Sequence, residues 1–208
     1  MSRFSQAISE GDGISVVPAL SGDVGSLAAA AEEAGAEAIA VATLGHAELA
    51  QPAAGLPVLV REPVEDVGRL LRLSELGVDA CVIRYDDLAG AGERLEELHA
   101  EALELDVDCA LDVEDEDQLE EALQRVDPDI VFISLRDGGD DEEELERALD
   151  LLPDVPAGKL VVVETNAVSR EQVLALERAG VDALVVRNLA GAPDFSRAVG
   201  ELVGGTRR

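Results

Sequence analysis

Charged side chains stand at the ends of several short apolar runs in this sequence. Glu164 directly follows the run Leu160–Val163, and Arg61, Asp112 and Arg136 lie at or just beyond three other runs. A guanidinium can hold an anion through two parallel hydrogen bonds, and a carboxylate kept away from water can act as a general base. These four are therefore candidate catalytic residues, with Glu164 as base or electrostatic stabiliser. Arg61 and Arg136 are expected to clamp an anion, and Asp112 is expected to orient Arg61.

Polar residues at other run ends are candidates for binding the substrate or its phosphate. The turn that begins Ser21-Gly-Asp-Val-Gly resembles a small phosphate nest, in which backbone N–H groups converge on an anion. The alternative for each such residue is an ordinary polar start of a loop. His46 and His99 stand without the neighbouring ligands of a metal site, so no metal is expected. The candidate binding residues are Ser21, Gly22, Ser134, Asn166, Arg187 and Asn188.

Eight apolar runs of strand length alternate with amphipathic stretches along the chain. Most runs are continuous, which is typical of parallel strands buried on both faces. The runs predict strands at Ile14–Ala19, Ala38–Thr43, Val58–Arg61, Ala80–Ile83, Ala110–Val113, Ile130–Ser134, Leu160–Glu164 and Ala183–Val186. The stretches between them predict helices at Val24–Ala34, Val64–Leu76, Ala91–Leu105, Glu116–Arg125, Asp141–Leu152, Ser169–Ala179 and Asp194–Val203, with a weaker pattern at His46–Gly55.

A phrase that reads as helix end, short loop and buried strand recurs before every second strand. Glycine begins three of its four copies, and glycine at this place is typical of a left-handed helix C-cap. One copy per two strand–helix units predicts an α/β fold, a single parallel eight-stranded (β/α)8 TIM barrel over residues 14–208 after a short lead of residues 1–13. An open doubly wound sheet is the alternative, because local patterns do not show closure. The copies begin at Gly35, Gly77, Val126 and Gly180.

The composition excludes several classes of partner. The 208 residues carry 45 acidic and 16 basic side chains, a formal net charge of −29, and a nucleic-acid backbone would need basic neutralisation. The apolar runs are too short to cross a membrane and Met1–Gly11 does not read as a signal peptide, so a cytoplasmic protein is expected. The acidic, lysine-poor composition fits adaptation to high salt, and a GC-rich genome is the alternative explanation. Cys81 and Cys109 lie in or beside apolar runs, where buried, reduced thiols are expected.

Four motifs give the chain a resemblance to the indole-3-glycerol phosphate synthase family of tryptophan biosynthesis. They stand in the order of that family's Leu-Pro-Val-Leu-Arg-Lys-Asp, Leu-Val-Glu-Val, Asn-Asn-Arg-Asp-Leu and Ser-Glu-Ser-Gly-Ile stretches. The similarity covers Ile14 to Gly204, without the family's long N-terminal helix. The motifs are Leu56–Glu62, Leu111–Val113, Ile133–Asp137 and Val163–Ala167.

The resemblance implies a reaction that closes the ring of a carboxyphenylamino-deoxyribulose phosphate, with loss of carbon dioxide and water and without a cofactor. In the family, a lysine after the third strand is the general acid, and a lysine after the first strand helps to bind the substrate. Arg61 or Glu62 stands in place of the third-strand lysine, whereas Arg136 and Glu164 match the family. The only lysine, Lys159, precedes the seventh strand and so belongs to the opposite end of the barrel.

These replacements leave three interpretations of function open. The first is a divergent family member that binds a small phosphorylated or carboxylated ligand, with weak or altered ring-closing activity, because arginine holds an anion well but releases a proton poorly. The second is a non-catalytic barrel that binds a phosphorylated ligand or regulates a partner such as another tryptophan-pathway subunit. The third is a different phosphosugar isomerase or lyase on the same scaffold.

Overall fold

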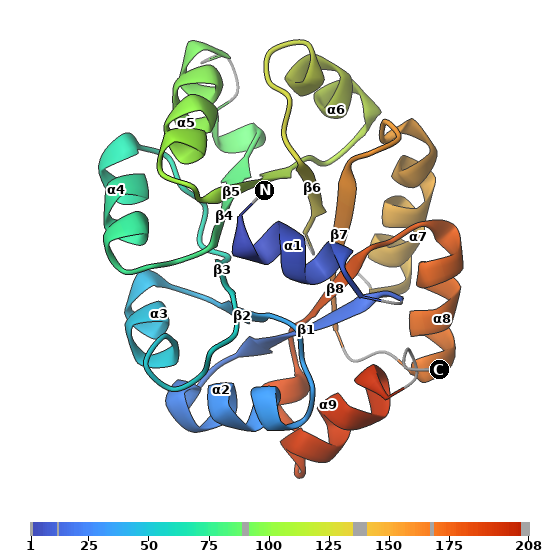
Figure 1. Ribbon diagram of the computed structural model, residues 1–208. Helices are drawn as coiled ribbons and strands as arrows, with labels where there is room; N and C mark the ends of the chain where they lie inside the picture. The colour runs from blue at the N-terminus through green and yellow to red at the C-terminus, as the bar shows by residue number, and fades with distance from the viewer. Residues whose placement is uncertain (1, 12, 89–91, 135–140, 167–168, 205–208) are drawn as a thin grey trace.

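Eight parallel strands close into a barrel in the computed structural model of the chain (Figure 1). Neighbouring strands follow chain order and the first pairs with the last, which confirms the TIM barrel and excludes the open sheet. The structure describes residues 2–11, 13–88, 92–134, 141–166 and 169–204, with 141–144 described by their backbone alone. The strands are β1 (Ser15–Leu20), β2 (Ile39–Val41), β3 (Val58–Val60), β4 (Ala80–Arg84), β5 (Asp108–Asp112), β6 (Ile130–Ile133), β7 (Leu160–Thr165) and β8 (Ala183–Val186).

A ring of helices surrounds the barrel, and most of them begin at a side chain that caps the helix. Asp23, Asp66, Asp115, Ser169 and Asp194 each accept a hydrogen bond from a backbone N–H in the first turn. No helix in the described part of the chain is both long and apolar enough to cross a membrane. The helices after β1 are α2 (Val24–Glu33), α3 (Leu44–Ala50), α4 (Val67–Glu75), α5 (Gly92–Glu104), α6 (Glu116–Leu123), α7 (Asp141–Leu151), α8 (Arg170–Ala179) and α9 (Phe195–Val203), with short 3-10 turns η1 (Asp86–Leu88), η2 (Leu152–Asp154) and η3 (Leu189–Gly191).

Side chains alternate along each strand between the inside of the barrel and the layer beneath the helices. Val17, Leu59, Val82 and Phe132 belong to the buried cluster inside the barrel. Their neighbours in the strands belong to a second, larger cluster that packs against the helices. This period of two follows from the pleat of a β-strand. It also decides which residues just beyond a strand can face the barrel axis.

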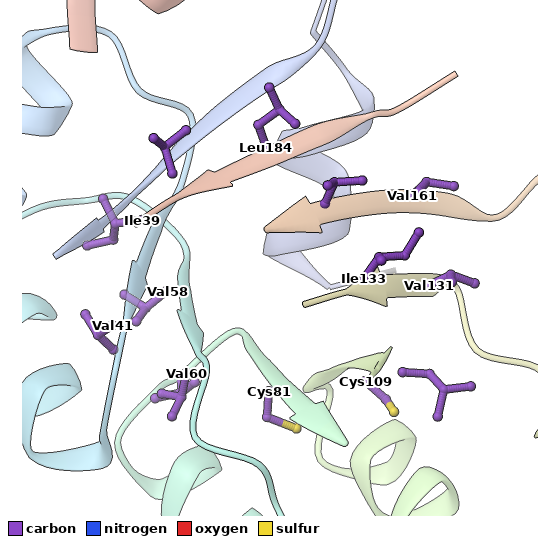
Figure 2. Close-up of a cluster of buried hydrophobic side chains, with 14 of the residues drawn as sticks. Ile39, Val41, Val58, Val60, Cys81, Cys109, Val131, Ile133, Val161 and Leu184 are labelled. Atoms are coloured by element: carbon purple, nitrogen blue, oxygen red, sulfur yellow. The ribbon is translucent and has the colours of Figure 1, made fainter. Parts of the chain in front are cut away.

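Two cysteines belong to the outer layer, where they lie opposite each other on neighbouring strands. Cys81 of β4 is the register partner of Cys109 of β5, and both are free, buried thiols (Figure 2). The prediction that both cysteines are buried is therefore confirmed. Burial raises the pKa of Cys81 to about 12 and raises that of Cys109 well above its ordinary value, because a thiolate is poorly solvated among apolar side chains.

The predicted lead of residues 1–13 contains a helix, α1 (Arg3–Ser9), that lies across the middle of the ring in Figure 1. Phe4 and Ile8 are buried with the interior cluster, so α1 fills the end of the barrel at which the strands begin. The helix is anchored through Asp108 of β5, whose carboxylate accepts hydrogen bonds from the Ser2 hydroxyl and, at 2.7 Å, from the backbone N–H of Ser5. The lead therefore packs as part of the barrel fold. Its two buried apolar residues are too few to predict a helix from the sequence.

In two copies of the sequence motif that recurs before the even strands, an aspartate accepts a hydrogen bond from the backbone of the neighbouring strand. Asp79 accepts a hydrogen bond from the backbone N–H of Val58 at 2.9 Å, and Asp182 accepts one from Val161 at 2.7 Å. In both cases an acid just before an even strand holds the start of the preceding odd strand. The glycines that begin the three glycine-containing copies have φ values of +74° to +103°, which confirms their left-handed conformation.

Candidate active site

A cavity of about 370 Å3 opens at the carboxyl ends of the strands, which we call the mouth of the barrel. Its floor is apolar, and the described part of its wall carries three guanidiniums, two carboxylates and two hydroxyls. Such a mixture of fixed charges above an apolar floor suits a small anionic ligand. The lining residues are Ala42, Thr43, Arg61, Glu62, Val82, Arg84, Phe132, Ser134, Glu164 and Arg187.

Most polar residues of this cavity share one position in their strands. Each of these stands two residues after an apolar side chain inside the barrel, as Arg61 follows Leu59 and Arg187 follows Val185. Because side chains alternate with a period of two, the polar side chain faces the same axis one layer higher. The same relation holds for Arg84, Asp112, Ser134 and Glu164. Thr43 and Glu62 are the exceptions, because the residues two positions before them belong to the outer cluster.

Arg61 and Glu164 form an ion pair across the mouth, between Arg61 Nη1 and Glu164 Oε1. Arg61 follows β3 and Glu164 belongs to β7, so the pair joins strands that stand opposite each other in the ring. The side chains are 22% and 6% exposed, and the Nε of Arg61 is buried without a hydrogen-bond partner among the described residues. The best single candidate base is therefore bound by Arg61, one of the two predicted anion clamps.

Asp112 is fully buried and organises the β4–β6 side of the mouth. Its Oδ2 accepts hydrogen bonds from Arg84 Nε at 3.0 Å and from the Ser134 hydroxyl at 2.8 Å, and its Oδ1 accepts one from the Ser134 N–H at 3.2 Å. The prediction that Asp112 orients Arg61 is wrong, because Asp112 lies beside Arg84 on the adjacent strand while Arg61 reaches across to Glu164. Burial lowers the pKa of Arg84, but its hydrogen bond to Asp112 and the nearby carboxylates outweigh burial and raise that pKa overall.

The structure brings only part of the predicted binding set into the cavity. Ser134 and Arg187 line it, whereas Ser21 and Gly22 are exposed on the loop after β1. Asn188 stands one residue past Arg187 and so faces outward, into a groove between α8, η3 and α9. Asn166 is half-buried beyond the end of β7, outside the residues that line the cavity. The predicted clamp Arg136 lies outside the described residues.

Several lining residues lie outside the predicted set of catalytic and binding residues. Val82 and Phe132 form the apolar floor, and Ala42 follows β2 with no polar group. Arg84, Thr43 and Glu62 stood at predicted strand ends but outside the candidate set. The signal that selects Arg84 is its distance of two residues from an interior position, which becomes readable only when the inward face of each strand is known.

Lys159 lies at the opposite end of the barrel, directly before β7, where it forms an ion pair with Asp127. No lysine side chain therefore reaches the mouth, since the chain has no other lysine. Within the described residues, no three His, Cys, Asp or Glu side chains gather closely enough to hold a metal ion. The polar groups of the mouth are instead arranged as guanidinium–carboxylate pairs.

Comparison with known proteins gives a consistent family signal. Residues 19–202 match the family model for indole-3-glycerol phosphate synthase. The indole-3-glycerol phosphate synthase of Geobacillus thermodenitrificans is 31% identical over 188 residues, covering 86% of this chain and 72% of that protein. The enzyme of the same name from Acidithiobacillus ferrooxidans is 34% identical over 137 residues, covering 66% of this chain and 51% of that protein.

Solved structures show the same barrel at much lower identity. Tryptophan synthase from M. tuberculosis, in a ligand-free form, has a TM-score of 0.74 at 16% identity, with both chains fully covered. A 3-hexulose-6-phosphate synthase has a TM-score of 0.73 at 16% identity, covering 93% of this chain and 99% of that one. These likenesses establish the fold, whereas the sequence relatives establish the family.

Proposed function

Because this chain belongs to the indole-3-glycerol phosphate synthase family, we propose that it binds a small phosphorylated ligand in the barrel mouth and closes the family's indole ring slowly. The observation that carries the proposal is the Arg61–Glu164 ion pair, which puts the candidate base of β7 and the residue at the general-acid position into one contact. The family's ring closure uses acid–base groups and an anion cradle; in this proposal Glu164 serves as the base and the guanidiniums of the mouth form the cradle.

The charge distribution supports an anionic ligand. The chain has a formal charge of −29, yet three of the arginines that the structure describes line one cavity of about 370 Å3. Arg61 and Arg84 are each paired with a carboxylate, and Arg187 has no carboxylate partner among the described residues. An arginine without a partner at a cavity wall is ready to bind a phosphate through two N–H groups. We assign the phosphate of the ligand to Arg187.

The rate of ring closure is expected to be low because the mouth has no lysine. A guanidinium stays protonated above pH ~12, so Arg61 can hold an anion and stabilise negative charge but gives up a proton poorly. Loss of a general acid typically lowers a rate by ~10²–10⁴-fold. In this proposal Glu164 is base or electrostatic stabiliser, Arg61 stabilises developing negative charge, and Arg136 remains a proposed anion clamp.

A second candidate function is a binding barrel without catalysis, and the lack of a lysine at the mouth favours it. The guanidiniums of the cavity wall can bind an anionic ligand, but a guanidinium does not readily release a proton. The partner of such a barrel could be another subunit of tryptophan biosynthesis. Turnover separates the two functions, because only the first makes product.

The test is turnover of the carboxyphenylamino-deoxyribulose phosphate by the purified chain, followed by indole fluorescence at low salt and in molar KCl. Slow product formation that disappears in Glu164→Gln supports the synthase reaction, and Arg197→Met on the outer face of α9 is the matched control. Absence of product together with thermal stabilisation by the substrate supports the binding barrel. Absence of both product and stabilisation contradicts the proposed function in either form.

A further inference from the structure

The ion pair between Arg61 and Glu164 divides the barrel mouth into two halves. In a closed ring of eight strands, β3 and β7 stand four strands apart on either route around the barrel. A contact between their ends therefore separates the ends of β4, β5 and β6 from the ends of β8, β1 and β2. A ligand that fills the mouth must lie over or beside this bridge.

Among the described residues, each half of the mouth contains one further guanidinium. Arg187 follows β8 on one side, and Arg84 ends β4 on the other. Arg84 is not part of the motifs that tie this chain to its family, and its side chain is 32% exposed at the cavity wall. Its Nε is engaged by Asp112, so the Nη edge of the fork is the part that faces solvent and ligand. The Asp87 carboxylate lies 3.9 Å from Nη1, and Glu164 is a further nearby carboxylate.

The β4–β6 half holds Arg84 in a fixed orientation. Asp112 is fully buried and bonds to both Arg84 and Ser134. Ser134 is in turn fixed from outside the barrel by Arg147 of α7, whose guanidinium donates to the Ser134 carbonyl at 2.7 Å and to the Glu114 carbonyl at 3.0 Å. A guanidinium oriented in this way loses little side-chain freedom when it binds an anion, which raises its contribution to affinity.

We propose that Arg84 is the specificity-determining residue of the mouth and forms a second oxyanion subsite, with Asp112 as its positioning residue. This inference rests on the proposed function, which places the phosphate at Arg187. The ligand then carries two oxyanions, one on each side of the Arg61–Glu164 bridge, with an uncharged middle over the bridge. A carboxylate and a phosphate would both satisfy the Nη fork of Arg84, so the experiment uses probes of each kind.

Matched probes test the second subsite by isothermal titration calorimetry. 6-Phosphogluconate and glucitol 6-phosphate have the same length and differ in a terminal carboxylate, and ribulose 1,5-bisphosphate and ribulose 5-phosphate differ in a second phosphate. The wild-type chain is expected to bind the member with two oxyanions at least about tenfold more tightly in one of these pairs. The pair that shows the preference identifies the oxyanion that Arg84 accepts.

The variants separate the second subsite from the first. Arg84→Met should abolish the preference for the second oxyanion while affinity for the singly charged probe stays within about twofold, whereas Arg187→Met should weaken both probes. If Arg84→Met does not fold, Arg84→Gln takes its place, because glutamine removes the charge but keeps a polar side chain. Arg197→Met, a change of an exposed arginine on α9, should alter neither affinity.

The role of Asp112 is tested by Asp112→Asn, which should reduce the preference without changing affinity for the singly charged probe. If Asp112→Asn only disturbed the folded structure of the mouth, it would weaken the binding of all probes together. An unchanged preference in Arg84→Met, or no preference in the wild-type chain, overturns the assignment of Arg84. If no phosphorylated probe binds the wild-type chain at all, the proposed function fails instead, and the two results are therefore distinguishable.

Discussion

Arg61 and Glu164, 103 positions apart in the sequence, meet in an ion pair that crosses the mouth of the barrel from β3 to β7. Glu164 is almost fully buried and Arg61 is partly so. Removing one partner of such a pair leaves a poorly solvated charge, which costs more than removing both.

We therefore expect Arg61→Met to lower the free energy of unfolding by about 1–3 kcal/mol, and the double variant Arg61→Met/Glu164→Met to lose less than the single one. Urea denaturation of the two single variants and the double variant gives the coupling between them. A loss in the double variant equal to the sum of the two single losses would show that the pair contributes no net attraction.

Arg61→Lys is expected to increase ring-closing activity. The substitution puts an amine, which can release a proton, at the position where the family has its general acid, and the gain should approach ~10²-fold in kcat. The measurement is indole fluorescence with the carboxyphenylamino-deoxyribulose phosphate. Arg94→Lys on α5, away from the mouth, is the control. A rate that stays unchanged in Arg61→Lys would show that the missing acid is not what limits the reaction.

The strands, and with them the site, follow from the sequence to a large extent. Continuous apolar runs fixed all eight strands to within a few residues, because a parallel barrel buries both faces of each strand. Glu164 and Arg187 could be assigned to the mouth because they end such runs. Their partners could not be assigned, since strand neighbours and opposite strands are set by closure of the ring.

Two features, the partner of Asp112 and helix α1, could not be predicted from the sequence, and each has a physical reason. Asp112 pairs with Arg84 because β4 and β5 are adjacent in register, and no local pattern distinguishes Arg84 from Arg61 as its partner. Helix α1 buries only Phe4 and Ile8 of its apolar side chains in the barrel, too few to give a clear helical period. Both features depend on contacts between residues far apart in the sequence, which local sequence patterns do not predict.

Phe4→Ala tests whether α1 fills the end of the barrel at which the strands begin. Phe4 is fully buried among the interior side chains, so its truncation should lower the free energy of unfolding by about 3 kcal/mol or more through a cavity. Ligand affinity at the mouth should not change, because α1 lies at the other end of the strands. Urea denaturation and phosphate-probe titration check the two statements, with Gln6→Ala on the exposed face of α1 as control. A stability equal to that of the control would mean that α1 is not docked.

The two buried thiols are expected to be unreactive in the folded protein. Burial raises the pKa of Cys81 to about 12, and both thiols lie beneath the helices, so little thiolate forms and reagent has no access. Ellman's reagent at pH 8 should label neither cysteine in the folded chain and both in urea. Cys109→Ala, which removes one of the two signals, assigns the labelling. Rapid labelling without urea would show that the layer over β4 and β5 opens.

The buried carboxyl group of Asp182 is expected to make the free energy of unfolding depend on pH. Burial raises the pKa of Asp182, and the hydrogen bond from Val161 N–H only partly opposes this. A raised pKa means that the folded state binds a proton more readily than the unfolded chain. This stabilising contribution is therefore complete below the unfolded pKa of 3.8 and is lost as pH rises through the folded value.

Asp182→Asn removes the charge and keeps an oxygen that can accept the Val161 N–H. The variant is expected to melt a few degrees higher than the wild-type chain at pH 7, at roughly 2–4 °C per kcal/mol for a chain of this size, and the gain should shrink toward pH 4. Thermal melts from pH 4 to 8 measure this difference, and Asp154→Asn, at an exposed position, should change little at any pH. A gain that grows toward low pH would contradict the raised pKa, because it would mean that the charged carboxylate stabilises the fold.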